Sequence, residues 1–202
     1  MRIAIIPARG GSRRIQKKNI REFSGRPIIA YSIETALESN LFHQVYVSSD
    51  SDEIGEVATR YGAKYIGREY EEAQDHVGTQ DVMKGCLKRL WSEYITHACC
   101  IYATAPMMTV QDLKHAWDLL QRNPSAEYVF AVAEAPFGPA GTFYFGRAHA
   151  FVRGAPLVHE TSIMIPIPPN RCCDINLETD WDRAEKMYAA LHTELLKENL
   201  CG

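Results

Sequence analysis

Five positively charged residues follow a short isoleucine-rich run near the start of the chain. Between positions 9 and 18 the sequence holds Arg9, Arg13, Arg14, Lys17 and Lys18, with Gly10, Gly11 and Ser12 among them. Glycine lets the backbone turn sharply and approach a ligand closely, so the N–H groups of such a turn can face anionic oxygens. Clustered cations repel one another unless negative charge lies between them. The stretch therefore predicts a site for a nucleoside triphosphate, and a solvated basic loop is the alternative.

Other residue types that could do chemistry lack the required spacing. The six cysteines form no C-x-x-C pair, and the adjacent pairs at 99–100 and 172–173 cannot both point to one side of a strand. We expect them to be free, mostly core residues. The seven histidines show no metal-ligand spacing, so they receive no catalytic role.

Length and charge narrow the class of protein. The chain has 202 residues, a net charge of −3 and a pI near 6.2, which suits one domain over residues 1–202 and favours no nucleic-acid partner. No stretch approaches the roughly 20 apolar residues of a membrane span. We therefore expect a soluble, cytoplasmic protein without a membrane partner.

The elements that must position the basic stretch alternate between strand and helix. Strands are expected at residues 3–6, 45–48, 63–66, 98–102 and 128–132, and helices at 27–39, 51–61, 79–93 and 110–123. Thr109 and Asp112 form a capping box at the last of these helices. Beyond residue 132 we expect a turn-rich stretch at 134–141, a short strand at 142–145, further turns to Pro169, and a final helix over 179–199.

This alternation predicts an α/β fold of three layers, a mostly parallel, Rossmann-like sheet with helices on both faces. Ligands in such sheets bind at the carboxyl ends of the strands. The basic stretch follows the first strand directly, so it falls where a site is expected.

Motifs along nearly the whole chain resemble those of the CMP-sugar synthetases, the cytidylyltransferases that activate sialic, legionaminic and pseudaminic acid. The matching segments are residues 6–14, 18–19, 25–32, 47–51, 78–79, 101–106, 142–146 and 174–181. The Gly-Gly-Ser-x-Arg form of residues 10–14 is most similar to the pseudaminic acid branch. The resemblance implies the nucleotide-diphospho-sugar transferase fold.

The resemblance also implies a reaction and a set of site residues. The anomeric hydroxyl of a nine-carbon keto-sugar acid attacks the α-phosphorus of CTP, giving the CMP-sugar and pyrophosphate. The pattern assigns the triphosphate to Arg9, Lys18 and Arg13, the last standing where the family usually has lysine. It assigns nucleotide binding to Ala8, Gly10, Gly11, Ser12, Asn19, Arg68 and Thr79, with Asn19 reading the cytosine ring. Taken alone, Arg68 reads as a surface arginine and Thr79 as a helix N-cap.

The metal implied by the resemblance is Mg²⁺. The family pattern is Asp-x-Asp, and this chain has Asp174 and Asn176 at those positions. If the segment is a strand, both side chains project to one side and can face one ion. The alternative is that Asp174 caps the final helix.

One segment of the family pattern has no counterpart here. Family members carry several tens of residues between the strand matching 128–132 and the motif matching 141–146, and this arm builds a homodimer. Residues 134–140 span that gap in this chain. Either the arm is absent, or a disordered stretch was omitted from the sequence; a homodimer is expected only if the arm exists.

Two other functions remain open at this stage. A nucleotide-binding homologue without synthetase activity, serving regulation or interaction, would explain Asn176 and the missing arm. A different nucleotidylyltransferase or a glycosyltransferase would keep the fold. A glycosyltransferase usually has Asp-x-Asp at a mid-chain strand end, whereas residues 102–106 contain no carboxylate.

Overall fold

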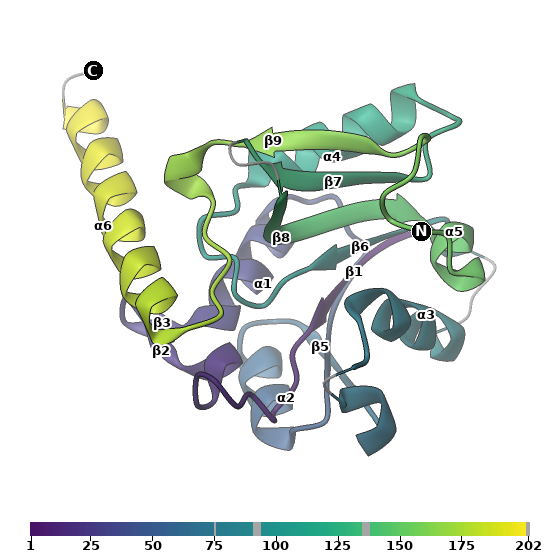
Figure 1. The fold of residues 1–202 in the computed structure, drawn as a ribbon, viewed down its shortest axis with the longest axis horizontal. Coiled ribbons are helices and arrows are strands. Elements are labelled where there is room, and N and C mark those ends of the chain that lie inside the picture. The colour runs from purple at the N-terminus through teal and green to yellow at the C-terminus, as the bar shows by residue number, and fades with distance from the viewer. Residues whose placement is uncertain (75, 91–93, 135–137, 201–202) are drawn as a thin grey trace.

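The computed structural model of the chain describes residues 1–74, 76–90, 94–134 and 138–200. Seven strands form one sheet in the order β5-β4-β1-β6-β8-β7-β9 (Figure 1). Their bounds are Arg2–Pro7 (β1), Gln44–Ser49 (β4), Lys64–Gly67 (β5), His97–Ile101 (β6), Tyr128–Ala133 (β7), Gly138–Arg147 (β8) and Ile163–Ile167 (β9). A separate hairpin pairs Glu22–Phe23 (β2) with Arg26–Pro27 (β3).

The sheet is mostly parallel, as predicted. β1 pairs in parallel with β4 and β6, β4 with β5, and β7 with β9. β8 is antiparallel to both of its neighbours, β6 and β7. Alternate residues of β1 reach opposite faces, so that Ala4 and Ile6 join one core while Ile3 and Ile5 join the other.

Helices cover both faces of the sheet, which confirms the three-layer prediction. The helices are Ile28–Glu38 (α1), Asp52–Arg60 (α2), Thr79–Arg89 (α3), Val110–Arg122 (α4), Ala148–Arg153 (α5) and Glu178–Leu200 (α6). Apolar residues of α1, α2 and α4 pack on one face, and those of α3 and α5 on the other. The predicted capping box of α4 is present, since Thr109 and Asp112 exchange side-chain and backbone hydrogen bonds.

A third core ties the two ends of the chain together. In this core, the amino-terminal part of the chain contributes Ile15, Phe23 and Tyr31. They pack against Ile175, which precedes α6, and Trp181, which lies in its first turn. Figure 1 shows α6 running along one side of the molecule, beside β2 and β3. This packing brings residues 174–181 back to the basic stretch.

The carboxyl-terminal third contains more regular structure than the sequence predicted. α5 and β9 lie within residues expected to be turns, and β8 is longer than the expected strand at 142–145. β9 was not predicted because its segment contains prolines. Pro166 is tolerated there because β9 is the edge strand of the sheet, where one residue can lack an N–H donor. The helix predicted at 79–93 is described as far as Arg89, and residues 91–93 lie outside the described part.

The cysteines and the lengths of the helices bear on two further predictions. The five described cysteines are free, and four of them are buried; Cys201 lies outside the described residues. No helix among the described residues is long and apolar enough to span a membrane.

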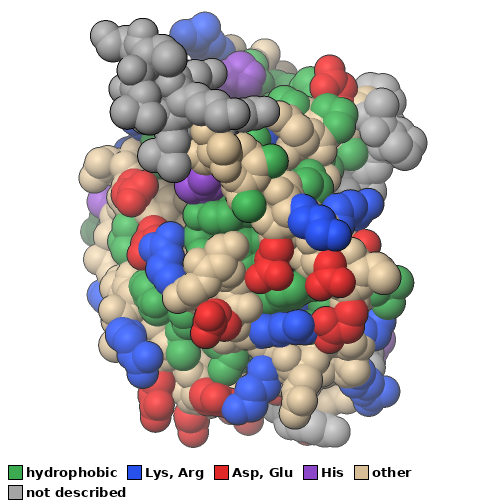
Figure 2. Space-filling view, turned by 90° about the vertical axis from the view of Figure 1, so that its left-hand side faces the viewer, with side chains coloured by type: hydrophobic (Ala, Val, Ile, Leu, Met, Phe, Trp, Pro, Cys, Tyr) green, Lys and Arg blue, Asp and Glu red, His purple; other side chains and the backbone are tan. Residues whose placement is uncertain are grey.

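Figure 2 shows the face along α6, where acidic and basic side chains are interspersed among the coloured residues. Neither sign of charge therefore forms a continuous patch on the visible part of that face.

Candidate functional site

Two adjoining cavities lie at the carboxyl end of β1. The basic cavity, of about 310 Å³, is lined by Arg9, Ser12, Arg13, Arg14, Lys18, Asn19 and Asn176. The switch-point cavity, of about 370 Å³, is lined by Pro7, Arg9, Lys18, Asn19, Arg68, Val77, Gly78, Thr79, Val82, Tyr102, Ala103 and Thr104. Arg9, Lys18 and Asn19 line both, so the two cavities form one continuous candidate site.

The position of the second cavity follows from the order of the strands. The chain leaves β1 toward β4 on one side and later returns to β6 on the other, so the connections after β1 and β6 diverge. Such a divergence opens a crevice at the carboxyl ends of the two strands. Residues 7–9 and 102–104 line its two sides.

The glycine turn after β1 is held against the end of β4. The Gly10 N–H donates to Asp50 Oδ1 at 2.8 Å, and a Cβ on Gly10 would lie 2.9 Å from Ser51 Cβ. The Ser12 N–H donates to Gly10 O at 2.9 Å. The N–H groups of Gly10 and Ser12 thus have acceptors within the protein and shape the turn.

Ala8 and Gly11 line neither of the two cavities. Ala8 is buried and its N–H donates to Ser48 O at 2.9 Å, which continues the pairing of β1 with β4. Gly11 is exposed. Neither residue is among those that line the site.

Asn19 is buried beneath the basic stretch. Its Nδ2 donates to Arg9 O at 2.9 Å, so the amide ties the two ends of the stretch together. The same side chain borders both cavities.

Lys18 is the half-buried cation at the junction of the cavities. Its Nζ donates to Ile175 O at 2.7 Å. Burial lowers the pKa of the Lys18 ammonium, and Arg14 and Arg9 lower it further, while the carboxylate of Asp174 opposes the shift. Lys18 therefore loses its proton more readily than an ordinary lysine.

Arg68 faces the switch-point cavity with unsatisfied donors. Its Nε and one terminal nitrogen (Nη2) are buried without a hydrogen-bond partner, while Nη1 donates to Glu72 O at 3.5 Å. Burial lowers the pKa of this guanidinium, and Asp50 and Glu72 oppose the shift. Buried donors without partners are costly, so this arginine is placed to receive an acceptor from a ligand.

Thr79 is the first residue of α3, and the N-cap is Gly78. The alternative reading of Thr79 as a helix N-cap is therefore wrong. Thr79 lines the switch-point cavity together with Arg9, Lys18 and Arg68.

Asp174 and Asn176 lie side by side, although the segment is not a strand. Asn176 Nδ2 donates to Asp174 Oδ2 at 2.7 Å, and Arg14 donates to Asn176 Oδ1 at 3.2 Å. Asp180, rather than Asp174, accepts the N–H groups of Asn176 and Leu177 before α6, at 3.0 and 2.9 Å. The helix-cap reading of Asp174 is therefore wrong. Asp174 is not among the residues that line either cavity, but its carboxylate contacts Asn176, which lines the basic cavity.

The donor set at Asp174 fits a hard cation that also binds substrate phosphates. Gly141 has φ of +63°, and a Cβ there would lie 3.0 Å from Asp174 Oδ1, so the glycine makes room for this carboxylate. Among the described residues there is no group of three or more His, Cys, Asp or Glu that could hold a metal ion. One carboxylate and one amide oxygen suit Mg²⁺ where phosphate oxygens and water supply the other ligands.

Arg14, one of the five cations of the basic stretch, lines the basic cavity. Two residues near the site were not predicted: Tyr102 lines the switch-point cavity, and Asp50 holds Gly10. The role of Asp50 needed the register of β1 with β4, which the sequence does not show.

An apolar pocket of about 280 Å³ adjoins the switch-point cavity through Tyr102. Its other lining residues are Phe130, Ala131, Val132, Ala140, Gly141, Thr142, Phe143, Tyr144, Leu157, Val158 and Met164. The hydroxyls of Thr142 and Tyr144 are buried there without a hydrogen-bond partner. The pocket thus combines an apolar lining with two hydroxyl-bearing residues.

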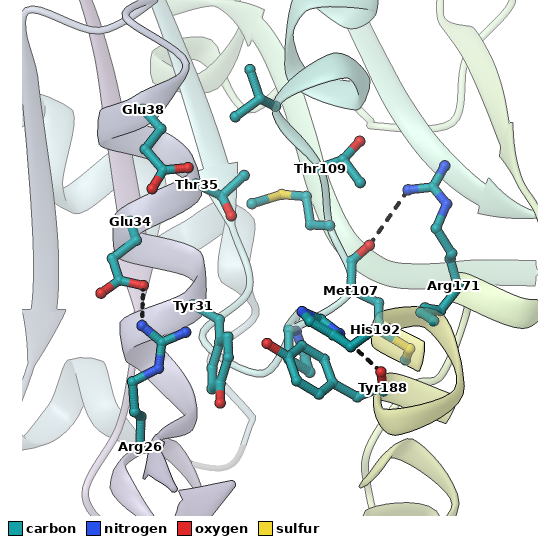
Figure 3. A pocket seen from close by; sticks show the side chains of 14 residues that line it. Arg26, Tyr31, Glu34, Thr35, Glu38, Met107, Thr109, Arg171, Tyr188 and His192 are labelled. Carbon is teal, nitrogen blue, oxygen red and sulfur yellow. Dashed lines mark hydrogen bonds and ion pairs between the residues drawn. The ribbon is translucent and has the colours of Figure 1, made fainter. Parts of the chain in front are cut away.

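A further cavity, of about 490 Å³, lies between α1 and α6 and is shown in Figure 3. None of the predicted site residues lines it. Its arginines are already paired, Arg26 with Glu34 at 2.6 Å and Arg171 with Asp112 at 2.6 Å. Both arginines of this cavity are therefore engaged with carboxylates of the protein.

Comparison with known proteins gives one consistent result. The cytidylyltransferase family model matches residues 3–137. Pseudaminic acid cytidylyltransferase of Campylobacter jejuni subsp. jejuni serotype O:2 is 34% identical over 226 residues, covering 94% of this chain and 97% of that protein. N-acylneuraminate cytidylyltransferase A of Danio rerio is 28% identical over 217 residues, covering 91% of this chain and 50% of that protein.

A solved structure of CMP:2-keto-3-deoxy-manno-octonic acid synthetase complexed with CTP is similar in fold. The TM-score is 0.75 at 13% identity, over 94% of this chain and 98% of that chain. The Campylobacter alignment, at 226 positions, is longer than this chain of 202 residues, so it includes positions without a counterpart here.

Proposed function

This chain belongs to the cytidylyltransferase family, and from that premise we propose that it transfers CMP from CTP to a nonulosonic acid and releases pyrophosphate. The observation that carries the proposal is the convergence of Arg9, Arg13 and Lys18 on one cavity at the carboxyl end of β1. The acceptor class rests on relatives named for pseudaminic acid and N-acylneuraminate.

Charge stabilisation is the main catalytic contribution in this proposal. The anomeric oxygen of the acceptor forms a bond to the α-phosphorus while the bond from that phosphorus to the β-phosphate oxygen breaks, and no covalent enzyme intermediate is formed. Negative charge grows on the leaving pyrophosphate. Arg9, Arg13 and Lys18, fixed beside it, therefore stabilise the transition state more than the bound substrate.

The nucleoside end of CTP is assigned to the switch-point cavity. Asn19 Nδ2 is engaged with Arg9 O, so Oδ1 is the atom that remains to accept from the amino group of cytosine. Arg68 and Thr79 line the same cavity, and the unsatisfied guanidinium nitrogens of Arg68 favour a contact with the nucleotide.

Asp174, with Asn176 beside it, is the residue that would hold Mg²⁺. When bound there, the ion supplies positive charge to the phosphate oxygens. Lys18 Nζ, fixed on Ile175 O, keeps the basic stretch next to this carboxylate. The neutral amide at 176 leaves one negative charge fewer than a second aspartate would.

The apolar pocket beside Tyr102 is our assignment for the acceptor. Nonulosonic acids carry acyl or methyl groups together with hydroxyls, which suits an apolar lining with the Thr142 and Tyr144 hydroxyls. Its continuity with the switch-point cavity through Tyr102 brings the acceptor next to the nucleotide.

A nucleotide-binding homologue without transferase activity is the second candidate. The specific observation in its favour is Asn176, whose Nδ2 donates to Asp174 and whose single oxygen, Oδ1, already accepts from Arg14. Under either candidate we propose that the chain acts in the cytoplasm, where CTP is available.

A panel of acceptors tests the proposal. Purified protein is incubated with CTP, Mg²⁺ and each of pseudaminic, legionaminic and sialic acid, and pyrophosphate is measured. We expect release with at least one acceptor and none without an acceptor. CTP binding without pyrophosphate release across the panel would favour the second candidate.

A further inference from the structure

An ion pair joins two distant parts of the chain that both lead to the candidate site. Arg171 ends the short 3-10 helix Pro169–Arg171, three residues before Asp174, and Asp112 lies in the first turn of α4. We propose that Arg171 is a positioning residue of the reaction, which acts through Asp112 to fix Asp174 relative to the bound nucleotide. The inference rests on the proposed function, because it takes Asp174 as the residue that would hold Mg²⁺.

The contact between Arg171 and Asp112 is bidentate and largely buried. Arg171 Nη1 donates to Asp112 Oδ2 at 2.6 Å, and Nη2 donates to Asp112 Oδ1 at 3.0 Å. The two side chains are only 22% and 11% exposed. Nη1 also donates to Met107 O at 3.4 Å, the contact drawn beside Arg171 in Figure 3. A planar fork that holds three acceptor atoms fixes direction as well as distance.

Asp112 extends this constraint to the loop that follows β6. Its Oδ2 accepts from the N–H and the hydroxyl of Thr109, at 2.9 and 2.8 Å. Burial opposes ionisation, but hydrogen bonds from Arg171 and Thr109 outweigh it and hold the pKa of the Asp112 carboxyl below its usual value. The pair therefore stays charged. The same loop begins with residues 103–104, which line the switch-point cavity.

The segment that carries Asp174 is packed in the same core as this loop. Cys173 and Ile175, the two neighbours of Asp174, are buried in the third core, and Met107 of the loop belongs to that core as well. Arg171 thus adds a directed polar contact to an apolar one. A shift of the loop and a shift of Asp174 are coupled through both.

Stability alone does not account for this arrangement. A buried ion pair gives up hydration for its electrostatic attraction, and apolar residues of similar size often stabilise a fold as well. The particular contribution of the pair is a fixed geometry between two segments. Mg²⁺ demands near-octahedral ligand positions, so a displaced carboxylate binds the ion less tightly.

Magnesium-dependent binding of CTP tests the proposal without turnover. CTP affinity is measured by calorimetry in EDTA and over a series of Mg²⁺ concentrations. The main variant is Arg171→Lys, because lysine keeps a positive charge beside Asp112 but lacks the fork that holds both carboxylate oxygens and Met107 O. If this variant does not fold, Asp112→Asn replaces it, since the amide oxygen can still accept from Thr109.

We expect Arg171→Lys to bind CTP in EDTA as the natural protein does. It should need about tenfold more Mg²⁺ for half of the increase in CTP affinity, because losing a contact that supports a metal ligand typically costs that much or more in metal affinity. Asp174→Ala should show a larger rise. Combining Arg171→Lys with Asp174→Ala should add nothing, since Arg171 acts through Asp174.

Two controls separate positioning from a loss of stability. Arg26→Lys alters another ion pair of the same cavity, that of Arg26 with Glu34 at 2.6 Å, which belongs to β3 and α1. Thr109→Ala removes the helix cap but leaves the contact of Arg171 with Asp112 in place. Both controls are expected to keep the natural Mg²⁺ requirement, while Thr109→Ala lowers the melting temperature.

The outcomes distinguish the inference from the function on which it rests. An unchanged Mg²⁺ requirement in Arg171→Lys, an equal rise in either control, a further rise in the double variant, or weaker CTP binding by Arg171→Lys in EDTA would overturn it. CTP binding by the natural protein that Mg²⁺ does not strengthen would overturn it too. If the natural protein does not bind CTP at all, the proposed function itself fails, and this inference fails with it.

Discussion

The site is built from single side chains whose other contacts keep them in place. Lys18 is held by Ile175 O, Asn19 by Arg9 O, and the turn at Gly10 by Asp50. Each of these contacts is local to the cavities, so substitutions here are expected to change binding and turnover more than folding.

Lys18→Ala tests the role of the half-buried cation. We predict a fall of about 100-fold or more in kcat/KM, because a fixed charge beside the leaving group is removed. The matched control is Lys17→Ala, since Lys17 is exposed and paired with Glu53 at 2.7 Å. Turnover near the natural value in Lys18→Ala would refute the assignment.

The lowered pKa of Lys18 adds a dependence on pH. As pH rises, Lys18 loses its proton below the usual lysine value of 10.5, because burial disfavours the charged form. CTP affinity should therefore weaken at alkaline pH before ordinary lysines titrate. Lys18→Ala should lack this loss in a titration of CTP affinity against pH.

At the scale of elements, β8 and the segment before α6 must approach closely for Asp174 to reach the site. Gly141 permits this, since a Cβ there would lie 3.0 Å from Asp174 Oδ1 and its φ is +63°. We predict that Gly141→Ala raises the Mg²⁺ concentration needed for half-maximal activity severalfold, because the carboxylate is displaced.

Gly62→Ala is the control for backbone strain alone. Gly62 also has positive φ, +91°, but its nearest neighbour is Leu37 on α1. Both variants should lose stability, of order 1 kcal/mol. An equal rise in the Mg²⁺ requirement in both would contradict a specific role for Gly141.

Sequence patterns were sufficient for the elements whose periodicity is strong. The isoleucines of β1, the apolar face of α2 and the capping box of α4 predicted their elements closely. α5 was missed because its six residues are too few to show a helical period, and β9 was missed because a proline within a short apolar run argues against a strand. β9 forms because it pairs with β7, a tertiary contact that local sequence does not encode.

The candidate site shows the same division between local and tertiary information. Site residues that are close together in the sequence were predicted as one group. Arg9, Arg13 and Lys18 are such a group, and they line one cavity. The fixing contacts of Asp50, Ile175 and Asn176 join segments distant in sequence, so only the packing of β4 and α6 reveals them.

At the scale of the whole molecule, folding is linked to pH through His97. Burial, with Arg147 and Arg2 nearby, lowers the pKa of this histidine from 6.5 to about 4. The unfolded chain takes up the proton near pH 6.5 while the folded chain resists it, so stability is retained above pH 6.5 and lost progressively as pH falls toward 4.

The expected change is about 1–3 kcal/mol in the free energy of unfolding. His97→Gln should show a smaller decrease over the same pH range in denaturant titrations, because glutamine takes up no proton. His192→Gln, at an exposed histidine, should behave as the natural protein. Equal decreases in all three proteins would exclude His97 as the cause.

The direct connection of β7 to β8 bears on assembly. Ala133 pairs with Gly138, so the antiparallel pairing of β7 with β8 extends to the point where family members carry the arm. Residues 135–137 of that connection lie outside the described part. We propose a monomer, and sedimentation should give one chain of 22.8 kDa; twice that mass would contradict the proposal.

The most direct test of the account is the stoichiometry of a reaction with CTP, Mg²⁺ and the preferred nonulosonic acid. Pyrophosphate is measured enzymatically, and the CMP-linked sugar acid is measured by mass spectrometry in the same sample. Direct displacement at the α-phosphorus predicts equal amounts of the two products. CTP bound without either product, or pyrophosphate formed without the CMP-linked acid, would contradict it.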